Sequence, residues 1–308
     1  MTHRKPAPRP ITAKDLDRIS LLTGWRKDPY DKRDCIRPYR AVGLPAEIDL
    51  SQILDEAYDQ GRVGSCVGNA LALLLAGLAK VFKVYQGTFS RTWIYNGARF
   101  LEGELPYDVG CYPRSALKWL VQKGALLEQF WPYDPARLDK KSPPSHLEPE
   151  AAKWPVFSFE RITGGALGIA SALAAGNLVA LGCPWPDNWM ATDPAGNLAK
   201  VQDSTPAAGG HEVLLYGYDS IDQVFLFQNS WGADWGESGR GRMPMASISF
   251  FNAQGGYDAH IVHVEWQAGP GPDPDEPPTP KPKIPKTAII ITLAAAGLAA
   301  LAMILASC

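Results

Sequence analysis

A change in hydrophobic periodicity near the middle of the chain limits its possible folds more than any other feature. Residues 46–130 carry apolar side chains at helical spacing, most clearly where leucines recur at i, i+3, i+4 and i+7 between Leu71 and Leu78. Residues 154–268 instead contain short apolar or alternating runs bounded by Gly, Asp and Asn, which are typical of antiparallel strands. Helices followed by strands predict an α+β fold with two lobes side by side.

Individual runs locate the elements of these two lobes. The stretch PRSALKWLVQKGAL predicts a helix that ends at Gly124, and residues 170–182 predict a change from helix to strand. The predicted strands lie in HEVLLYGYD, QVFLFQNSWG, ASISFF and HIVHVEW. The last of these carries His260 and His263, whose spacing directs them to opposite faces of a strand and makes them a poor metal-binding pair.

Composition and charge exclude several classes of protein. Of the 308 residues, 46% are hydrophobic, so the chain can bury a sizeable core. A net charge of −2 gives no general attraction to nucleic acid, and no zinc cluster, P-loop or dinucleotide-binding motif is visible. We therefore expect a monomer with no nucleic-acid partner, no metal ion and no cofactor.

The cysteines and the N-terminus favour a reducing compartment. Five scattered cysteines form no disulfide framework, and no apolar signal-peptide core follows the basic N-terminus.

Local composition divides the chain into four parts. Residues 1–45 are basic and contain proline, and we expect them to form an extended lead to a folded domain that covers residues 46–268. Proline dominates residues 269–287, which predicts a semi-rigid linker. Residues 288–307 carry no charge and are long enough to cross a bilayer as a transmembrane helix.

We expect residues 288–307 to be a single-pass C-terminal membrane anchor. The alternative is a hydrophobic helix folded back on the domain, but the stiff linker makes that arrangement awkward. Lys281, Lys283 and Lys286 precede the span and no basic residue follows it, so the positive-inside rule predicts that the folded domain faces the cytoplasm. Cys308, at the end of the chain, is a candidate for lipidation.

Cys66 lies where a loop meets the first turn of a buried helix. The N-terminus of a helix carries a partial positive charge and unpaired N–H groups, and both favour the thiolate, which is the nucleophilic form of cysteine. His211 opens a strand after a pair of glycines and is the best candidate for a base. Asn229 follows in sequence, between a strand and a Gly-rich aromatic loop. The positions of Cys66 and His211 suit a nucleophile and its base.

Three stretches, DQGRVGSC, GGHEVLLYGYD and QNSWGADWGESGRGRM, resemble in this order the active-site blocks of papain-like cysteine peptidases. A fourth, GCYPRSALKWL, resembles the wall of the substrate cleft and the helix after it. The resemblance implies a papain-like two-lobe fold with a helical left lobe and an antiparallel, barrel-like right lobe. Because residues 1–45 are too short to resemble the family's long propeptide, we expect a bacterial-type member whose activity needs no processing or is restrained by the lead.

The resemblance implies a role for each matching position. Cys66 would attack the scissile carbonyl, and His211 would pair with it and then protonate the leaving amine. Asn229 would orient the imidazole, as the third group of a triad does. Gln60 would donate its side-chain amide to the oxyanion beside the N–H of Cys66. Trp231 would cover the hydrogen bond between asparagine and histidine.

The resemblance also implies a substrate cleft. Trp235 would line its leaving-group side, and the other substrate-binding positions would be Gly110, Cys111, Tyr112, Pro113 and Glu212. Cys111 replaces a family glycine whose backbone binds substrate, so its side chain is expected to narrow the cleft. Glu212 replaces a small apolar residue, and two placements stay open: its carboxylate faces solvent, or it faces a pocket and favours a basic or polar substrate side chain.

We therefore expect a membrane-anchored cysteine peptidase that hydrolyses protein or peptide substrates through an acyl-enzyme, near the cytoplasmic face of a membrane. Two alternatives stay open on the same fold: a catalytically silent peptide-binding scaffold, and an acyl or aminoacyl transferase. The intact set of nucleophile, base, orienting group and oxyanion donor argues against the silent scaffold, because a binding domain needs neither a thiol nor its base.

Overall fold

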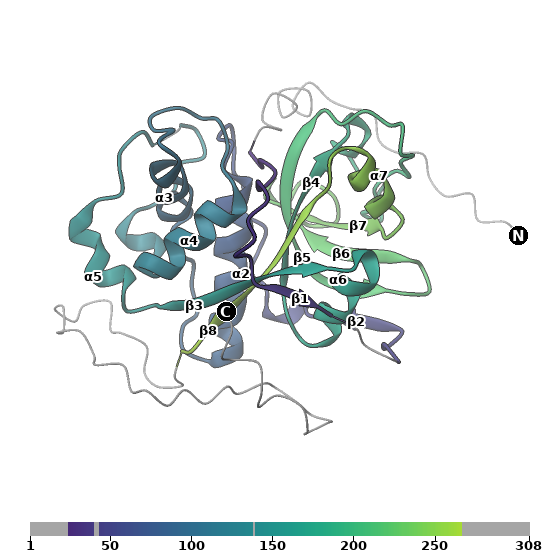
Figure 1. Cartoon of the computed structure of the whole chain (residues 1–308), viewed down its shortest axis with the longest axis horizontal. Coiled ribbons are helices and arrows are strands. Elements are labelled where there is room, and N and C mark those ends of the chain that lie inside the picture. The colour runs from purple at the N-terminus through teal and green to yellow at the C-terminus, as the bar shows by residue number, and fades with distance from the viewer. Residues whose placement is uncertain (1–23, 40–42, 138, 267–308) are drawn as a thin grey trace, which may run out of the picture.

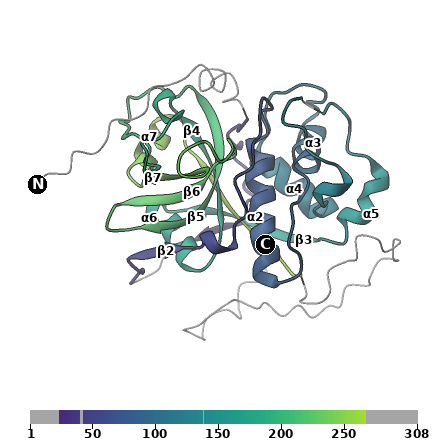
Figure 2. The ribbon, with the colours of Figure 1, turned by 180° about the vertical axis from the view of Figure 1, so that it is seen from behind.

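The long helix α2 (Cys66–Phe82) lies between a helical lobe and a β-sheet lobe, as Figures 1 and 2 show from opposite sides. The computed structural model describes residues 24–39, 43–137 and 139–266. Residues 66–77 of α2 are all buried, because β5 packs on one side of the helix and α3 on another. A helix that is covered on all sides is apolar on all sides, which explains its unbroken run of Ala, Leu and Gly after Asn69.

The helical lobe packs three elements together beside α2. These are α3 (Arg91–Glu102), α4 (Pro113–Lys123) and the short α5 (Glu148–Ala151), with the 3-10 turns η2 (Glu128–Phe130) and η3 (Ser145–Leu147). Ser90 caps α3, since its Oγ accepts the N–H of Trp93 at 3.0 Å. The predicted end of the next helix at Gly124 is confirmed, because Gly124 is the C-cap of α4.

Within the described residues, the other lobe is built on one eight-stranded sheet. Its strands are β1 (Ile36–Pro38), β2 (Glu47–Asp49), β3 (Val156–Thr163), β4 (Val179–Trp185), β5 (Gly209–Asp219), β6 (Val224–Gln228), β7 (Arg240–Pro244) and β8 (Asp258–Val264). They lie in the order β1-β3-β8-β4-β5-β6-β7, and β2 pairs with β5. The ladders between these strands are antiparallel except for β1 with β3, which is parallel.

The remaining short elements accompany the sheet. They are α6 (Gly165–Ala174), α7 (Ser247–Ala253), η1 (Ser51–Ile53) and η4 (Asp187–Trp189). Figure 1 shows α6 and α7 beside the strands, on the far side of the sheet lobe from the helical lobe. In both views β3 and β8 run from the sheet toward the helical lobe, so these two long strands join the lobes.

Two apolar cores meet at β5. One lies between α2 and the sheet and includes Val67 and Leu71 of the helix and Leu214 of the strand. The other includes Val213 and Leu215, the neighbours of Leu214. Because alternate residues of a strand point to opposite faces, β5 is buried on both faces. This burial fixes the strand's N-terminal end, where the predicted base lies.

The α+β architecture expected from the periodicity is confirmed, but one predicted strand is wrong. The run ASISFF forms helix α7 instead. Ile248 and Phe251, three residues apart, are both buried in the second core together with Phe250. Short apolar runs fit a strand or a helical turn equally well by periodicity, and packing against the rest of this core decides between them.

The described part of the lead, residues 24–39, runs along the domain and adds β1 to the edge of β3. The predicted linker, residues 269–287, and the predicted transmembrane helix, residues 288–307, lie outside the described residues. Among the residues that are described, no helix is long and apolar enough to cross a membrane.

Candidate active site

Cys66 is the first residue of α2, and its thiol is fully buried. The preceding Ser65 does not cap the helix, because its Oγ bonds the hydroxyl of Tyr133 instead. Burial raises the pKa of the Cys66 thiol, and backbone hydrogen bonds from Glu212 and Val67 to the sulfur offset this only in part. The bond from Glu212 places the sulfur beside the start of β5.

His211 and Asn229 are joined by a hydrogen bond between two neighbouring strands. His211 lies near the start of β5, and Asn229 directly follows β6, which pairs with β5. The Nε2 atom of His211 lies 2.7 Å from Oδ1 of Asn229, and the N–H of Ser230 donates to the same oxygen at 2.8 Å. Because an amide oxygen only accepts, Nε2 must carry the proton, and Nδ1 is the nitrogen left to exchange one.

Two tryptophans pack against the imidazole, and a third supports one of them. The ring of Trp231 lies on His211 with 4.6 Å between ring centroids and 30° between planes, and Trp185 meets it edge-on at 4.8 Å. Trp235 is fully buried and donates its indole N–H to the carbonyl of Met190. It packs edge-on against Trp231 at 5.5 Å. We predicted that Trp235 lines the leaving-group side of the cleft, whereas this structure buries it behind Trp231 as support.

Gln60 is held in one orientation by the residue that follows Asn229. Its Oε1 accepts the hydroxyl of Ser230 at 2.6 Å, and its backbone N–H donates to the carbonyl of Ser230 at 2.8 Å. Its Nε2 donates to the carbonyl of Val63 at 3.0 Å. An amide nitrogen carries two hydrogens, so this arrangement leaves a second N–H for an oxyanion.

The lead lies against the thiol, at contacts that no local sequence pattern specified. The N–H of Cys111 donates to the carbonyl of Gly24 at 3.0 Å, and the N–H of Arg26 donates to the carbonyl of Cys111 at 3.1 Å. A β-carbon on Gly24 would lie only 2.5 Å from the sulfur of Cys66. The backbone that we predicted to bind substrate therefore binds residues 24–26 of the same chain.

The neighbours of Cys111 shape the same wall. Gly110 adopts a φ of +72°, which favours glycine, and its N–H donates to the hydroxyl of Tyr95 at 3.2 Å. Tyr112 stacks under the guanidinium of Arg26 at 4.2 Å and accepts its hydrogen bond at 2.8 Å. Pro113 begins α4 and is buried. Tyr112 thus contacts the lead, while Pro113 is the first residue of α4.

Glu212 is buried, which excludes one of the two placements that the sequence left open. It is 1% exposed, and neither carboxyl oxygen has a hydrogen-bond partner among the described residues. Burial raises its pKa well above the usual value, and the carboxyls of Asp258 and Asp28 act in the same direction. The solvent-facing placement is therefore wrong, because the alternation of β5 puts Glu212 on the same buried face as Leu214.

With the lead in place, the surroundings keep the nucleophile and the base uncharged. Burial raises the pKa of Cys66, as described above, and burial lowers the pKa of His211 to about 4 although the bond to Asn229 acts in the opposite direction. The thiolate, not the thiol, is the nucleophile. Covering the pair therefore disfavours its reactive charged state.

A comparison with known proteins identifies the family of this chain. The model of a family described as "Papain family cysteine protease" matches residues 44–252. The chain belongs to the papain family of cysteine proteases. The likeness assigns it the activity of a cysteine endopeptidase and confirms the papain-like α+β fold.

Individual relatives agree with this assignment to the papain family. An uncharacterized peptidase C1-like protein of Acanthamoeba polyphaga mimivirus is 31% identical over 266 residues, covering 76% of this chain and 85% of that protein. The crystal structure of xylellain, a cysteine protease from Xylella fastidiosa, is similar with a TM-score of 0.73 and 27% identity over 80% of this chain and 97% of that one. Digestive procathepsin L 3 of Tenebrio molitor, at 17% identity, has the same fold with a TM-score of 0.64 over 86% of this chain and 84% of that chain.

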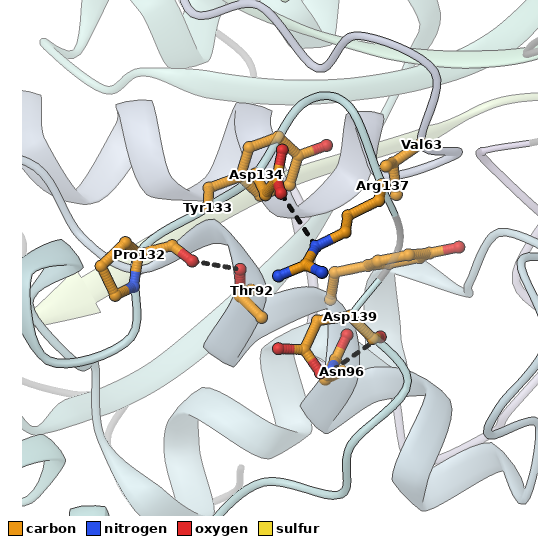
Figure 3. Close-up of a pocket in the computed structure, with 9 residues that line it drawn as sticks. Val63, Thr92, Asn96, Pro132, Tyr133, Asp134, Arg137 and Asp139 are labelled. Atoms are coloured by element: carbon orange, nitrogen blue, oxygen red, sulfur yellow. Dashed lines mark hydrogen bonds and ion pairs between the residues drawn. The ribbon is translucent and has the colours of Figure 1, made fainter.

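A separate small hollow of about 80 Å³ lies in the helical lobe of this papain-family chain (Figure 3). Its lining is Val63, Thr92, Tyr95, Asn96, Pro132, Tyr133, Asp134, Arg137 and Asp139. Arg137 pairs with Asp134 at 3.0 Å. Tyr133 links the hollow to the start of α2, because its hydroxyl bonds Ser65 and the carbonyl of Gln60.

Among the described residues, no group of His, Cys, Asp or Glu is arranged to hold a metal ion.

Replacing Glu212 by glutamine tests whether its carboxyl is buried in the protonated form. Because the folded pKa is raised above the ordinary 4.5, the carboxyl's contribution to stability is complete below that pH and is lost as the pH rises toward the folded pKa. Glu212→Gln cannot ionise, so the parent chain should lose more stability than the variant between about pH 4 and pH 8, by about 1.4 kcal/mol for each pKa unit of the shift. Urea unfolding at both pH values measures this.

Glu160→Gln is a matched control for which we expect the opposite pH dependence of stability. Burial acts to raise the pKa of Glu160, but its pairing with His263 and Arg37 lowers that pKa overall. Its contribution to stability is therefore present above the ordinary pKa and lost in acid, so Glu160→Gln should cost more at neutral pH than at low pH. Equal pH dependence of the parent and of Glu212→Gln would contradict the burial of a protonated Glu212.

Proposed function

We propose that this papain-family chain hydrolyses peptide bonds through a Cys66–His211–Asn229 triad and an acyl-enzyme. The hydrogen bond of 2.7 Å from Nε2 of His211 to Asn229 carries the proposal, because it fixes the tautomer in which Nδ1 can act as a base. The thiol proton passes to Nδ1, the sulfur attacks the carbonyl carbon, and the imidazolium returns the proton to the leaving amine. Water then cleaves the thioester and releases the free thiol.

The oxyanion formed in each attack would be held by two donors. One is the backbone N–H of Cys66 at the N-terminus of α2, and the other is the second amide hydrogen of Gln60. The bond from Ser230 to Gln60 ties this donor to the loop that carries Asn229. The side-chain amide of Gln60 and the side chain of Asn229 are therefore held at fixed positions relative to each other. Stabilisation of a transition state by preorganised donors requires such fixed positions.

Single substitutions in the triad test these roles. Cys66→Ala should abolish hydrolysis of a fluorogenic peptide, and His211→Ala should lower kcat by roughly 10⁴-fold or more, while Asn229→Ala costs less because it acts only through the imidazole. Labelling by a peptidyl epoxide should disappear in Cys66→Ala and persist in Cys35→Ser, a control at a thiol outside the site. Hydrolysis by Cys66→Ala would mean that another residue is the nucleophile, and labelling without turnover would favour the peptide-binding scaffold.

We also propose that the lead restrains this activity. Gly24 lies against the sulfur of Cys66, and the backbone of Cys111 binds the lead on both sides of Trp25. A substrate that uses the same backbone groups has to displace residues 24–26. Of the two possibilities that the sequence left open, restraint by the lead has this support.

Displacing the lead should therefore raise the reactivity of Cys66. Gly24→Ala puts a methyl group where the sulfur lies, and Trp25→Ala removes the bulky side chain that holds the segment, so each should speed labelling by a peptidyl epoxide about tenfold or more. Lys32→Ala, at an exposed position of the same lead, should leave the labelling rate unchanged. Rates in Gly24→Ala and Trp25→Ala equal to that of the parent would show that the lead does not control access.

We propose further that residues 288–307 hold the peptidase at a membrane, with the domain in the cytoplasm. The support is the sequence alone: an uncharged stretch of sufficient length after a proline-rich linker with three lysines. Three further expectations likewise stay predictions from sequence: that the chain is a bacterial-type member, that it is a monomer, and that it resides in a reducing compartment.

Membrane extraction of the full chain tests the anchor. The parent should stay with the membrane fraction after alkaline carbonate washing, and removal of residues 269–308 should release it. Leu298→Arg is the matched control in the full chain, since a charge at the centre of a span costs about 2.5–3.5 kcal/mol of insertion. Parent protein in the soluble fraction would rule out the anchor.

A further inference from the structure

Two walls hold the backbone of Gly24 between them. On one side, the carbonyl of Gly24 accepts the N–H of Cys111 at 3.0 Å. On the other side, a β-carbon on Gly24 would lie 2.5 Å from the sulfur of Cys66 and 2.9 Å from the carbonyl oxygen of Gly64. The space between Cys111 and the loop that leads to Cys66 is therefore only as wide as one backbone segment.

The side chains of Tyr95 and Asp108 connect these two walls. The carboxylate of Asp108 accepts the N–H of Gly64 at 3.2 Å on Oδ1 and 3.1 Å on Oδ2. The hydroxyl of Tyr95 donates to Oδ1 of Asp108 at 2.5 Å and accepts the N–H of Gly110 at 3.2 Å. Gly64 is two residues before Cys66, and Gly110 directly precedes the residue that holds the lead. A continuous chain of hydrogen bonds therefore runs from the loop of the nucleophile to the opposite wall.

Helix α3 holds this pair of side chains in place. Tyr95 is 1% exposed, and burial together with the nearby carboxylate of Asp108 raises its pKa, so its hydroxyl keeps the proton that it donates. The guanidinium of Arg99, one turn later on α3, lies 4.3 Å from the centroid of the Tyr95 ring. The same guanidinium donates to the carbonyl of Tyr107 at 2.8 Å. Although Asp108 is exposed, the residue before it is thus fixed to the helix that carries Tyr95.

The separation of the two walls matters for the reaction. When a substrate replaces the lead, one wall holds its backbone through Cys111, while the other carries the sulfur of Cys66 and the oxyanion donors. Attack requires the reacting atoms to lie about 3–3.5 Å apart, and a misplacement of about 1 Å can cost roughly 10²-fold in rate. Whatever fixes the distance between the walls therefore fixes how closely the carbonyl carbon approaches the sulfur.

We propose that Tyr95 and Asp108 are positioning residues, which hold the backbone of a bound peptide at the distance from Cys66 that attack requires. The proposal rests on the proposed function, because it takes a peptide to replace the lead on Cys111. Neither side chain exchanges a proton with the substrate, and each acts through the backbone of a glycine. Their loss should slow reactions of Cys66 with a bound peptide, without slowing its reaction with a small reagent that binds neither wall.

A ratio of two labelling rates in the full chain tests this role. In each variant, Cys66 is labelled by a peptidyl epoxide and, separately, by iodoacetamide, and mass spectrometry of the peptide that contains Cys66 gives both rates. Both reagents need an uncovered thiolate, so the fraction of molecules that have released the lead cancels in the ratio. Labelling of the fully buried Cys183 measures any unfolded molecules, whose share is subtracted.

Removal of either member of the pair should lower the ratio of epoxide to iodoacetamide rates. We expect a fall of about tenfold in Asp108→Ala and in Tyr95→Phe, because each breaks the connection between the walls. Asp108→Asn should retain most of the ratio, since an amide oxygen still accepts N–H and O–H donors. Because Asp108 is exposed, Asp108→Ala keeps the test available if Tyr95→Phe does not fold.

Two matched controls remove similar groups elsewhere. Asp49→Ala deletes an exposed carboxylate that accepts the N–H of Ser51 at 2.7 Å, and Tyr218→Phe deletes a hydroxyl that donates to the carbonyl of Pro45 at 2.9 Å from a buried ring. Both should leave the ratio at the parent's value. A merely structural role of the pair would change the two labelling rates alike and so would also leave the ratio unchanged.

Failure of the positioning role and failure of the proposed function give different results. Equal ratios in the parent, Asp108→Ala and Tyr95→Phe, or an equal fall in a control, would overturn the positioning role and leave the peptidase standing. Absence of both epoxide labelling and peptide cleavage, in the parent and in Trp25→Ala, would overturn the proposed function and the positioning role with it.

Discussion

The contact between the first turn of α2 and the start of β5 is the constraint on which the rest of this molecule depends. It brings a thiol at a helix N-terminus beside a strand that carries the base, and the backbone N–H of Glu212 donates to the sulfur. The contact is held by the core between helix and sheet, where Val67 and Leu71 pack with Leu214. Because β5 is buried on both faces and α2 nearly all round, neither element can shift without opening a core. The two lobes are therefore fixed along the line where the chemistry takes place.

The same burial that fixes the site also makes it unreactive in the covered state. Removing water from Cys66 and His211 favours the uncharged thiol and the uncharged imidazole, and the hydrogen bond that His211 donates to Asn229 is too weak to reverse this for the imidazole. The lead supplies part of that cover, since Gly24 lies against the sulfur. The restraint that we propose would couple access of substrate to activation of the nucleophile, because one displacement of the lead would serve both.

One place where the lead is held is Asp258, a residue outside the papain-like motifs. A buried carboxylate is costly unless donors surround it, and Lys27, the N–H of Asp28 and the indole of Trp25 all donate to this one. The carboxylate of Asp258 therefore serves the lead when the cleft is closed.

The sequence by itself determined the parts of this protein that rest on local patterns. Helical periodicity and a helix-terminal cysteine located Cys66 at the start of α2, Gly124 marked the end of α4, and the order of three motifs indicated the papain family. Only the tertiary structure decided what depends on register and on contacts between distant segments. The run ASISFF became a helix because of the core that it meets. Glu212 and Asp258 came to flank Gly182 because three strands far apart in sequence align there, and no local pattern in any one of them encodes that alignment.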